Sequence, residues 1–338
     1  MPDPQYVIFG SEYSPFSVKV RSYFRYKDIP HEWRPRNRDN LAEFQALAKL
    51  PLIPLVLSPD GTVQQDSTPI IETFEEAFPD PALQPPSELL AYLSCLIEDY
   101  ADEWVNKPMF HYRWWRTEDQ EAVSVALARA NMPNGDREAI EELAATVRKR
   151  MVPRLSFVGS NEVTKPVIEA SLDNLLTLLN AHLRGRNYLF GGRPALADFG
   201  MFGQIYGCLQ QPTTEKIIRQ NYPEITSWIE QMLDPEIHGD WEDWSSLAPT
   251  LEPILKSEIG ALYLPWSLAN EAAVLKRKDD FSLTLMGQPF NQQTVKYAAK
   301  SLQVLRSRLA GVKDRQSLDR ILQDCDCLQP LVTKSQTA

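Results

Sequence analysis

Cysteine and histidine are both scarce in this chain, which has four of each among its 338 residues. The cysteines are scattered, so a disulfide framework is not expected. Cys325 and Cys327 lie close together, but two thiols lack the ligand number that a zinc site needs. His182 and His238 have no cysteine or carboxylate partner at ligand spacing. We therefore expect no metal site.

Long hydrophobic runs and an excess of basic charge are also missing. No apolar run approaches the ~20 residues that span a bilayer, and residues 1–9 lack the basic and apolar segments of a signal peptide. The net charge is −10, whereas nucleic acids and anionic membranes bind clustered Lys and Arg. A phosphate-binding glycine loop and a Ser-His-Asp pattern are not found either. We expect a cytoplasmic protein without nucleic-acid or membrane partners.

The first part of the chain alternates strand and helix patterns. Strands are predicted at residues 6–9, 31–35, 52–57 and 62–64, and helices from Pro15, at 40–50 and after Asp66. Ser58-Pro59-Asp60-Gly61 has the composition of a hairpin turn between the last two strands. The predicted order is therefore β-α-β-α-β-β-α.

A proline-rich segment at residues 79–87 marks a domain boundary, because it interrupts regular structure. Almost everything after it has helical periodicity, with helices expected at residues 88–104, 136–151, 165–183, 197–209 and 222–233. The tail holds an apolar stretch at 252–268, a strand pattern at 281–285 and a helix pattern at 292–309. We divide the chain into an α/β domain (1–85), an all-helical domain (88–240) and a mostly helical C-terminal extension (241–338).

Ile53-Pro54 places a proline between two apolar runs, where it cannot donate a ladder hydrogen bond. A cis bond costs only ~0.5–1 kcal/mol more than trans before proline. It would turn the preceding backbone N–H and C=O outward, where an extended peptide could pair with them. An ordinary edge proline is the alternative.

Two further motifs point to a ligand. Asp66-Ser67 opens a helix, and its N–H groups, hydroxyl and helix dipole suit a carboxylate, although simple N-capping explains the pair equally well. Ser14-Pro15-Phe16-Ser17 lies where the first strand meets the first helix. A hydroxyl there can donate to the thiolate of a ligand. Tyr13 and Ser11 are alternative donors in the same loop.

These three motifs together resemble the N-terminal domain of glutathione transferases, over about residues 5–80. The resemblance implies a thioredoxin-like domain followed by an all-helical domain, and glutathione as substrate or cosubstrate. By matching position it assigns the catalytic role to Ser14, and glutathione contacts to Ser14, Phe16, Ile53, Pro54, Asp66 and Ser67. Asp198 matches the acidic residue of the family's capping box, with Ala195 in the place of the N-cap hydroxyl.

The resemblance also implies an apolar electrophile as acceptor and a homodimer. The matching first helix of the second domain borders the acceptor pocket in the family. Tyr13, His111, Tyr112 and Trp115 are therefore acceptor-site candidates, although aromatic residues at helical spacing also fit a core.

The leading hypothesis is a glutathione-dependent transferase. Conjugation, dehalogenation and ether cleavage would use the same thiolate. A thiol reductase is disfavoured because positions 14 and 17 are serine. A binding or scaffold protein that keeps the fold without catalysis is the alternative.

The apolar stretch at residues 254–268 needs a covering partner, and we expect the chain's own first two domains to supply it.

Overall fold

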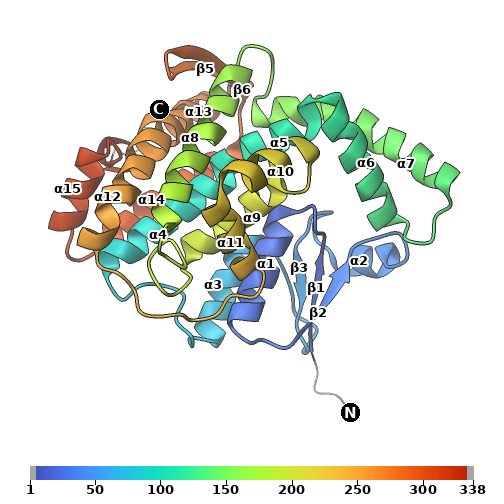
Figure 1. Cartoon of the computed structure of the whole chain (residues 1–338), viewed down its shortest axis with the longest axis horizontal. Helices are drawn as coiled ribbons and strands as arrows, with labels where there is room; N and C mark the ends of the chain where they lie inside the picture. The colour runs from blue at the N-terminus through green and yellow to red at the C-terminus, as the bar shows by residue number, and fades with distance from the viewer. Residues whose placement is uncertain (1–4, 333–338) are drawn as a thin grey trace.

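The computed structural model describes residues 5–332, and its first seven elements form a layered α/β domain (Figure 1). They are β1 (Tyr6–Gly10), α1 (Pro15–Tyr26), β2 (His31–Pro35), α2 (Leu41–Leu47), β3 (Leu55–Leu57), β4 (Val63–Gln65) and α3 (Ser67–Ala77). The strands form one sheet in the order β2-β1-β3-β4, in which β1 and β2 are parallel and the other pairs antiparallel. The predicted element order and the thioredoxin-like class are confirmed.

Helices cover both faces of this sheet. Ile8 of β1 belongs to the main apolar core together with residues of α1 and α3. Its neighbour Phe9 points to the other face and packs with Phe44 of α2 in a smaller core. Successive strand side chains point to opposite faces, so the short apolar runs of the sequence supply both cores.

The helix α1 begins at the serine that the sequence analysis singled out. Ser14 is the N-cap in an extended conformation (φ −103°, ψ 109°), and its Oγ accepts a hydrogen bond from the Ser17 N–H at 3.3 Å. Pro15 occupies the first turn, where a missing N–H leaves no bond unmade. Ser14 therefore lies at the positive end of the α1 dipole.

A helical body follows the proline-rich segment. Its elements are α4 (Glu88–Tyr100), the π-helical turn η1 (Ala101–Val105), α5 (Asn106–Trp115), α6 (Thr117–Asn131), α7 (Arg137–Met151), the 3-10 segment η2 (Val152–Val158), α8 (Lys165–Leu183), α9 (Leu196–Cys208), α10 (Pro212–Asn221) and α11 (Pro223–Met232). The predicted helices are present within a few residues, whereas α6 and α10 were not predicted. α6 and α7 pair into a hairpin that projects beside α2 (Figure 1).

Asp198 anchors the buried helix α9. Its carboxylate accepts hydrogen bonds from the N–H groups of Leu189 and Ala195, both at 2.9 Å, and from the indole of Trp228 at 3.1 Å. Burial raises the pKa of Asp198 to about 7, although these bonds oppose the shift. The predicted reach of Asp198 to the N-cap N–H is confirmed.

A close approach between α1 and α9 supports the Ser14 end of α1. A Cβ atom at Gly203 would lie 2.5 Å from the carbonyl oxygen of Pro15. That separation is far below van der Waals contact, so only glycine lets α9 support the first turn of α1 directly.

The extension comprises α12 (Trp244–Ile254), the π-helical segment η3 (Leu255–Tyr263), α13 (Leu264–Leu275), β5 (Asp280–Leu285), β6 (Gln288–Gln293), α14 (Lys296–Gly311), α15 (Gln316–Asp324) and α16 (Leu328–Val332). Its aromatic residues Tyr263 and Trp266 are fully buried in the main core. The indole of Trp266 contacts that of Trp104 in η1, with 5.9 Å between ring centroids. The apolar stretch is therefore covered by the chain itself, as expected.

The hairpin β5–β6 corrects the predicted helix at residues 292–309. Residues 288–293 pair with β5 as an antiparallel strand, and α14 begins only at Lys296. The two residues between the strands, Met286 and Gly287, have positive φ angles of 50° and 71°. Such a pair is what a two-residue type I′ hairpin turn requires.

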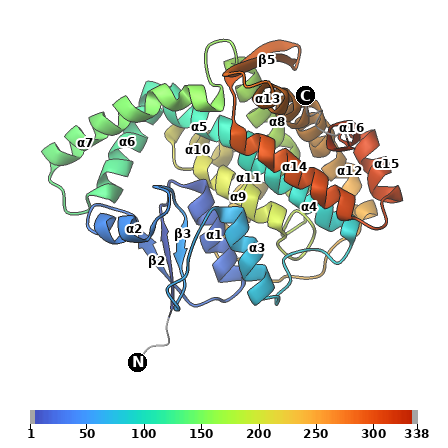
Figure 2. The ribbon, with the colours of Figure 1, turned by 180° about the vertical axis from the view of Figure 1, so that it is seen from behind.

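Helix α14 packs against α4, and Figure 2 shows the two helices side by side. Arg308 of α14 forms an ion pair with Glu72 of α3. The hydroxyl of Ser301 donates a hydrogen bond to Asp99 of α4. The extension thus contacts both α3 and α4.

Candidate functional site

Two cavities share one lining residue, Ile53, in the loop before β3. The first, which we call the cis-proline cavity, has a volume of about 450 Å³. The α/β domain contributes Phe16, Leu50, Leu52, Ile53, Pro54, Gln65, Asp66 and Ser67 to its lining. Apart from Ser14, all the residues predicted to contact glutathione lie together in this cavity.

The loop that leads to the cavity is held by one side chain. Gln65 Oε1 accepts hydrogen bonds from the N–H groups of Lys49 and Leu50, at 2.9 and 3.1 Å. Its Nε2 donates to the carbonyl oxygens of Leu50 and Leu52, both at 2.8 Å. The Ile53–Pro54 bond that follows is cis, as predicted. The role of Gln65 was missed because its sequence position is that of an ordinary strand residue.

Asp66 and Ser67 form the turn into α3. Asp66 has a φ of 83° and a ψ of 123°, an uncommon conformation for a residue with a side chain. Its side chain makes no cap hydrogen bond to α3, and Ser67 is buried at the first position of the helix. Strained backbone of this kind persists where the surroundings fix it, often at ligand sites. The side chain of Asp66 therefore does not act as a simple N-cap of α3.

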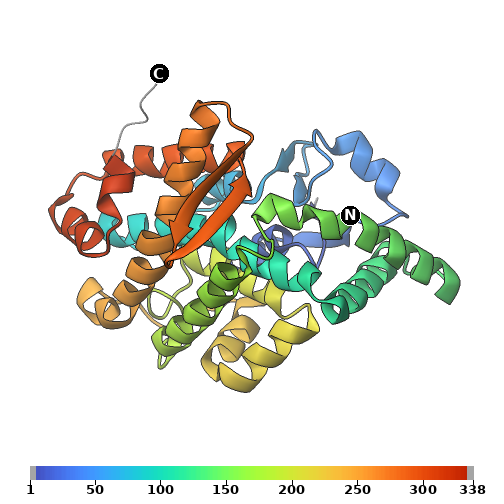
Figure 3. The ribbon, with the colours of Figure 1, turned by 90° about the horizontal axis from the view of Figure 1, so that it is seen from above.

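The opposite wall of the cis-proline cavity comes from far along the chain. It consists of Asp102, Glu103, Asn106 and Lys107 from η1 and α5, Phe157 and Val158 from η2, and Trp266, Gln292, Val295 and Tyr297 from the extension. Seen from above in Figure 3, the β5–β6 hairpin lies beside the green segment that contains η2. There Gln292 Nε2 donates a hydrogen bond to the carbonyl oxygen of Phe157 at 2.7 Å. None of these residues was predicted, because no local motif marks them.

Lys107 is the cation of that wall. It is 3% exposed, donates a hydrogen bond to Gln292 Oε1 at 3.0 Å and lies 3.8 Å from the ring centroid of Trp266. Burial lowers the pKa of Lys107 to about 7, although the nearby carboxyl of Glu103 opposes the shift. Burial, followed by the charges of neighbouring acids, raises the pKa of Glu103 to about 8. Burial therefore disfavours the charged form of both groups.

A buried ion cluster lies beneath the Asp66 turn. Lys19 of α1 forms ion pairs with Glu98 of α4 and, at 2.7 Å, with Asp102 of η1, and it donates to Thr68 Oγ1 at 3.1 Å. Burial by itself would lower the pKa of Lys19, but the two carboxylates outweigh it and hold the pKa above its usual range. Removing one partner from such a cluster leaves an unpaired buried charge. The cluster thus fixes α1 and α3 relative to η1.

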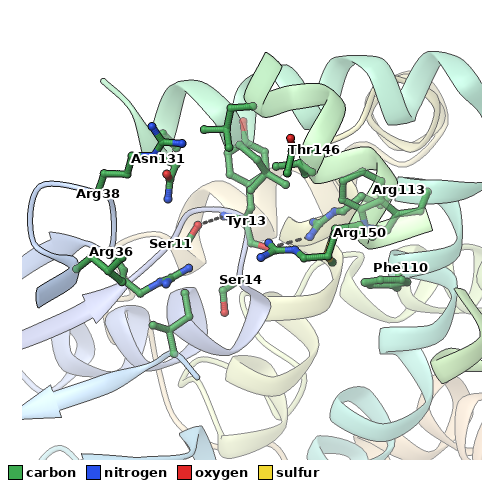
Figure 4. A pocket seen from close by; sticks show the side chains of 18 residues that line it. Ser11, Tyr13, Ser14, Arg36, Arg38, Phe110, Arg113, Asn131, Thr146 and Arg150 are labelled. Carbon is green, nitrogen blue, oxygen red and sulfur yellow. Dashed lines mark hydrogen bonds between the residues drawn. The ribbon is translucent and has the colours of Figure 1, made fainter. Parts of the chain in front are cut away.

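The second cavity, which we call the Ser14 cavity, has a volume of about 440 Å³ and is shown in Figure 4. It is lined by Ser11, Tyr13, Ser14, Arg36, Arg38, Leu41 and Ile53 of the α/β domain and by Phe110, Arg113, Trp114, Leu127, Ala130, Asn131, Leu143, Thr146, Val147, Arg150 and Met151 of the helical body. Ile53 lines both cavities. The two cavities are therefore neighbours on either side of Ile53.

All three candidate donors, Ser11, Tyr13 and Ser14, line the Ser14 cavity. The Oγ of Ser11 accepts the Tyr13 N–H at 3.2 Å, and that of Ser14 accepts the Ser17 N–H at 3.3 Å. Burial raises the pKa of Tyr13, which disfavours its ionised form. Ser14 differs from the others in capping α1. Ser17 is fully buried and lines neither cavity.

The acceptor candidates on α5 are placed away from both cavities. His111 is buried, bonded through Nδ1 to Ser160 Oγ at 2.7 Å and stacked on Trp115 at 5.0 Å between centroids. Tyr112 is 7% exposed and contacts the His111 ring edge-on. Burial lowers the pKa of His111 to about 4. These three residues therefore belong to the packing between helices.

The same helix reaches the Ser14 cavity with its other face. Phe110, Arg113 and Trp114 line it, and their spacing of three and four residues puts them on one side of α5. The acceptor candidates His111, Tyr112 and Trp115 thus lie on α5 but not on the face that lines the cavity, and aromatic residues occupy both sides of this helix. Tyr13 is the one acceptor candidate that lines the cavity.

Residues 5–332 contain neither a membrane-spanning helix nor a group of candidate metal ligands. None of the helices there has the length and apolarity to cross a membrane. Within the same range, no three His, Cys, Asp or Glu side chains group as metal ligands.

The fold and the two cavities define a thioredoxin-like protein with an attached helical domain. The profile of the glutathione S-transferase N-terminal domain matches residues 8–82, and that of the C-terminal domain matches residues 134–231. Together the matches cover just over half of the chain. The chain therefore belongs to the glutathione S-transferase family. Neither match reaches the extension.

Solved structures similar to this chain include family members of low sequence identity. Glutathione transferase GSTFuA3 from Phanerochaete chrysosporium has 15% identity and a TM-score of 0.48, covering 70% of this chain and 99% of its own. Beta-etherase LigF from Sphingobium sp. strain SYK-6 has 15% identity and a TM-score of 0.48, with 73% and 99% covered. A glutathione S-transferase from Methylobacterium radiotolerans, in complex with glutathione sulfonate, has 18% identity and a TM-score of 0.40, with 73% and 94% covered. No curated protein matches the chain in sequence. Identities this low carry no information on activity.

Proposed function

We propose that this protein is a glutathione-dependent transferase. Glutathione occupies the cis-proline cavity, and Ser14 stabilises its thiolate for attack on an electrophile in the Ser14 cavity. The observation that carries the proposal is that Ile53 lines both cavities. One cavity holds the Ile53–Pro54 and Asp66–Ser67 motifs, and the other holds Ser14.

The γ-glutamyl end of glutathione is a zwitterion, and the cis-proline cavity offers groups for both of its charges. The hydroxyl of Ser67 and the N–H groups at the start of α3 suit its carboxylate. Asp66 carries the carboxyl group that suits its ammonium. In the family, the backbone of the residue before the proline binds the cysteinyl part of glutathione, and here that residue is Ile53.

Ser14 is suited to stabilise the sulfur. Its Oγ already accepts the Ser17 N–H, so its hydroxyl proton is available for a thiolate. A hydrogen bond to a charged group contributes ~1.5–3 kcal/mol, and a helix N-terminus ~0.3–1 kcal/mol. One pKa unit corresponds to ~1.4 kcal/mol, so the pKa of the thiol, ~8.5 in water, falls by roughly one to three units. A substantial thiolate fraction then exists at neutral pH.

The reaction itself is a displacement or an addition. The thiol proton goes to solvent, and the thiolate electron pair forms a sulfur–carbon bond. In a displacement, the leaving group departs with the electron pair of the bond that breaks. In an addition, the electron pair of the attacked double bond takes a proton from water. The same thiolate would serve conjugation, dehalogenation and ether cleavage.

Calorimetric titration with glutathione tests the proposal. We expect saturable binding by the full-length protein, and an increase in thiolate absorbance near 240 nm at pH 7. Lack of binding at millimolar glutathione would contradict the proposal and favour a family member that has abandoned its site. Binding without a lowered thiol pKa would favour the scaffold alternative.

A further inference from the structure

The charge of the Ser14 cavity is unlike that of the whole protein. The chain has a net charge of −10, yet four arginines line this cavity: Arg36, Arg38, Arg113 and Arg150. Among the described residues, no Asp or Glu belongs to its lining. The cavity is therefore a cationic site in an acidic protein.

Arg113 contributes a buried charge that neutral groups hold in place. It is 5% exposed and donates to the carbonyl oxygens of Tyr13 and Gly207, at 2.7 and 3.0 Å, and to Gln211 Oε1 at 3.3 Å. Burial lowers the pKa of Arg113 to about 10, which leaves it protonated at neutral pH. Its three partners orient the guanidinium without cancelling its charge.

Arg36 and Arg150 face each other across the cavity. In Figure 4, Arg36 comes from the sheet side and Arg150 from α7, and both point toward the space beside Ser14. Burial lowers the pKa of Arg36, and the charge of Arg150 lowers it further, as expected of two cations close together. Among residues 5–332, neither forms an ion pair with a carboxylate.

Like charges repel, and the half-buried Arg36 loses hydration without gaining a carboxylate counterion. An anion between Arg36 and Arg150 relieves both costs. The rest of the lining is mainly apolar, with Phe110, Trp114 and Val147 of α5 and α7. The cavity thus combines an apolar wall with a site for negative charge.

We propose that the electrophile accepted in the Ser14 cavity carries a carboxylate or another anionic group, bound between Arg36 and Arg150. Its apolar part lies against Phe110 and Trp114, and its reactive carbon faces the glutathione sulfur at Ser14. This inference rests on the proposed transferase function and narrows the expected apolar electrophile to an anionic one. In the step, the sulfur–carbon bond forms while the leaving group departs with its electron pair, and the anionic group is unchanged.

The glycine carboxylate of glutathione is an alternative anion that could bind to Arg36 and Arg150. If that carboxylate occupied the arginines, their substitution would weaken glutathione binding. If the acceptor occupies them, substitution changes the choice of acceptor and leaves the glutathione dissociation constant within about twofold. Calorimetry and kinetics on one set of variants separate these cases.

The test uses two acceptors of nearly equal shape, 4-chloro-3-nitrobenzoate and its methyl ester. Rates are divided by the uncatalysed rate of each compound with glutathione. We expect the full-length protein to favour the carboxylate by about tenfold or more in kcat/KM. Arg150→Gln and Arg36→Gln should each lower this ratio about tenfold, mainly through KM. Arg154→Gln, which removes an exposed arginine one turn beyond the cavity, is the matched control and should leave the ratio unchanged.

Binding of the unreactive 3-nitrobenzoate in the presence of glutathione tests the anion site apart from turnover. We expect its binding to weaken about tenfold in Arg150→Gln and to be unchanged in Arg154→Gln. Equal preference for acid and ester, or nitrobenzoate binding unaffected by Arg150→Gln, overturns the proposal. Loss of glutathione affinity in Arg150→Gln also overturns it, by assigning the arginines to glutathione. If nitrobenzoate binds as expected but no acceptor reacts, the transferase function fails while the anion site stands.

Discussion

Tyr297 in α14 donates a hydrogen bond from its hydroxyl to Oδ2 of Asp66, at 2.9 Å. The two residues are 231 positions apart in the chain. The bond joins the extension to the turn before α3, at the residue with the uncommon backbone conformation. It therefore orients a carboxylate that we propose to bind the ammonium group of glutathione.

Tyr297→Phe should weaken glutathione binding two- to tenfold. The variant keeps the ring and removes one hydrogen bond, which contributes ~0.5–1.5 kcal/mol when neighbouring water can replace it. Calorimetric titration measures the change. Tyr222→Phe removes a hydroxyl that lies outside both cavities and should leave the affinity unchanged. Equal affinities for Tyr297→Phe and the wild type would show that Asp66 needs no orientation from the extension.

Ser14→Ala should raise the pKa of bound glutathione by one to two units and lower turnover about ten- to a hundredfold. Alanine also loses the cap bond to Ser17, which costs about 1 kcal/mol of stability. Ser14→Asp separates the two effects, because aspartate caps a helix but cannot donate to a thiolate when ionised.

The ultraviolet absorbance of the thiolate over a pH series, together with steady-state rates, measures these changes. We expect Ser14→Asp to keep the stability of the wild type and to be at least as impaired as Ser14→Ala. If Tyr13→Phe or Ser11→Ala instead loses activity while Ser14→Ala retains it, the donor is another hydroxyl of the same cavity.

Deletion of residues 245–338 should give insoluble protein. The extension buries Tyr263 and Trp266 against the helical body, and Trp104 of η1 contacts Trp266. Removing it exposes large aromatic surfaces, which promote aggregation. Expression followed by separation of soluble and insoluble fractions measures the outcome. A soluble truncation that binds glutathione would show that the extension is needed neither for folding nor for the site.

His182→Gln should make stability less dependent on pH. The ring of His182 bonds to Thr250 Oγ1 at 2.7 Å and to the Leu189 carbonyl at 2.9 Å. Burial lowers its pKa to about 4, although the bond to Leu189 opposes the shift. An unfolded histidine has a pKa of ~6.5, so this group contributes stability that is fully present above that pH. The contribution is lost as the pH falls from about 6.5 to 4.

Between pH 7 and pH 5, the wild type should therefore lose about 2 kcal/mol more unfolding free energy than His182→Gln. Urea unfolding at the two pH values measures the difference. His238→Gln, which replaces an exposed histidine, is the control and should keep the pH dependence of the wild type. If the unfolding free energies of the wild type and His182→Gln change with pH in parallel, His182 can be protonated in the folded protein.

Local patterns were sufficient to predict the α/β domain. Ser14, Ile53-Pro54 and Asp66-Ser67 are each signalled by neighbours in sequence, since capping and proline placement act over a few residues. The apolar faces of α7, α8 and α11 made those helices predictable in the same way. Strand β6 was not predicted because its polar residues resemble the start of a helix. Its pairing with β5 depends on the turn at Met286-Gly287.

The remaining walls of the cavities could not be predicted from local patterns. Lys107, Gln292 and Tyr297 come together through contacts between distant segments. The arginines of the Ser14 cavity are likewise spread over the loop after β2, α5 and α7. Each of them has the appearance of an ordinary surface or helix residue in the sequence, and only the tertiary fold turns them toward one space.

The position of Tyr297 also bears on how the chain is made. Ribosomes add roughly 5–20 residues per second, and domains fold in the order of their synthesis. Ser14, Pro54 and Ser67 leave the ribosome early, whereas α14 follows on the order of ten to fifty seconds later. During that interval a nascent chain has one side of its cis-proline cavity open to water. The cavity gains this wall only after α14 has emerged, so the proposed glutathione site is completed by the extension and not by the first two domains alone.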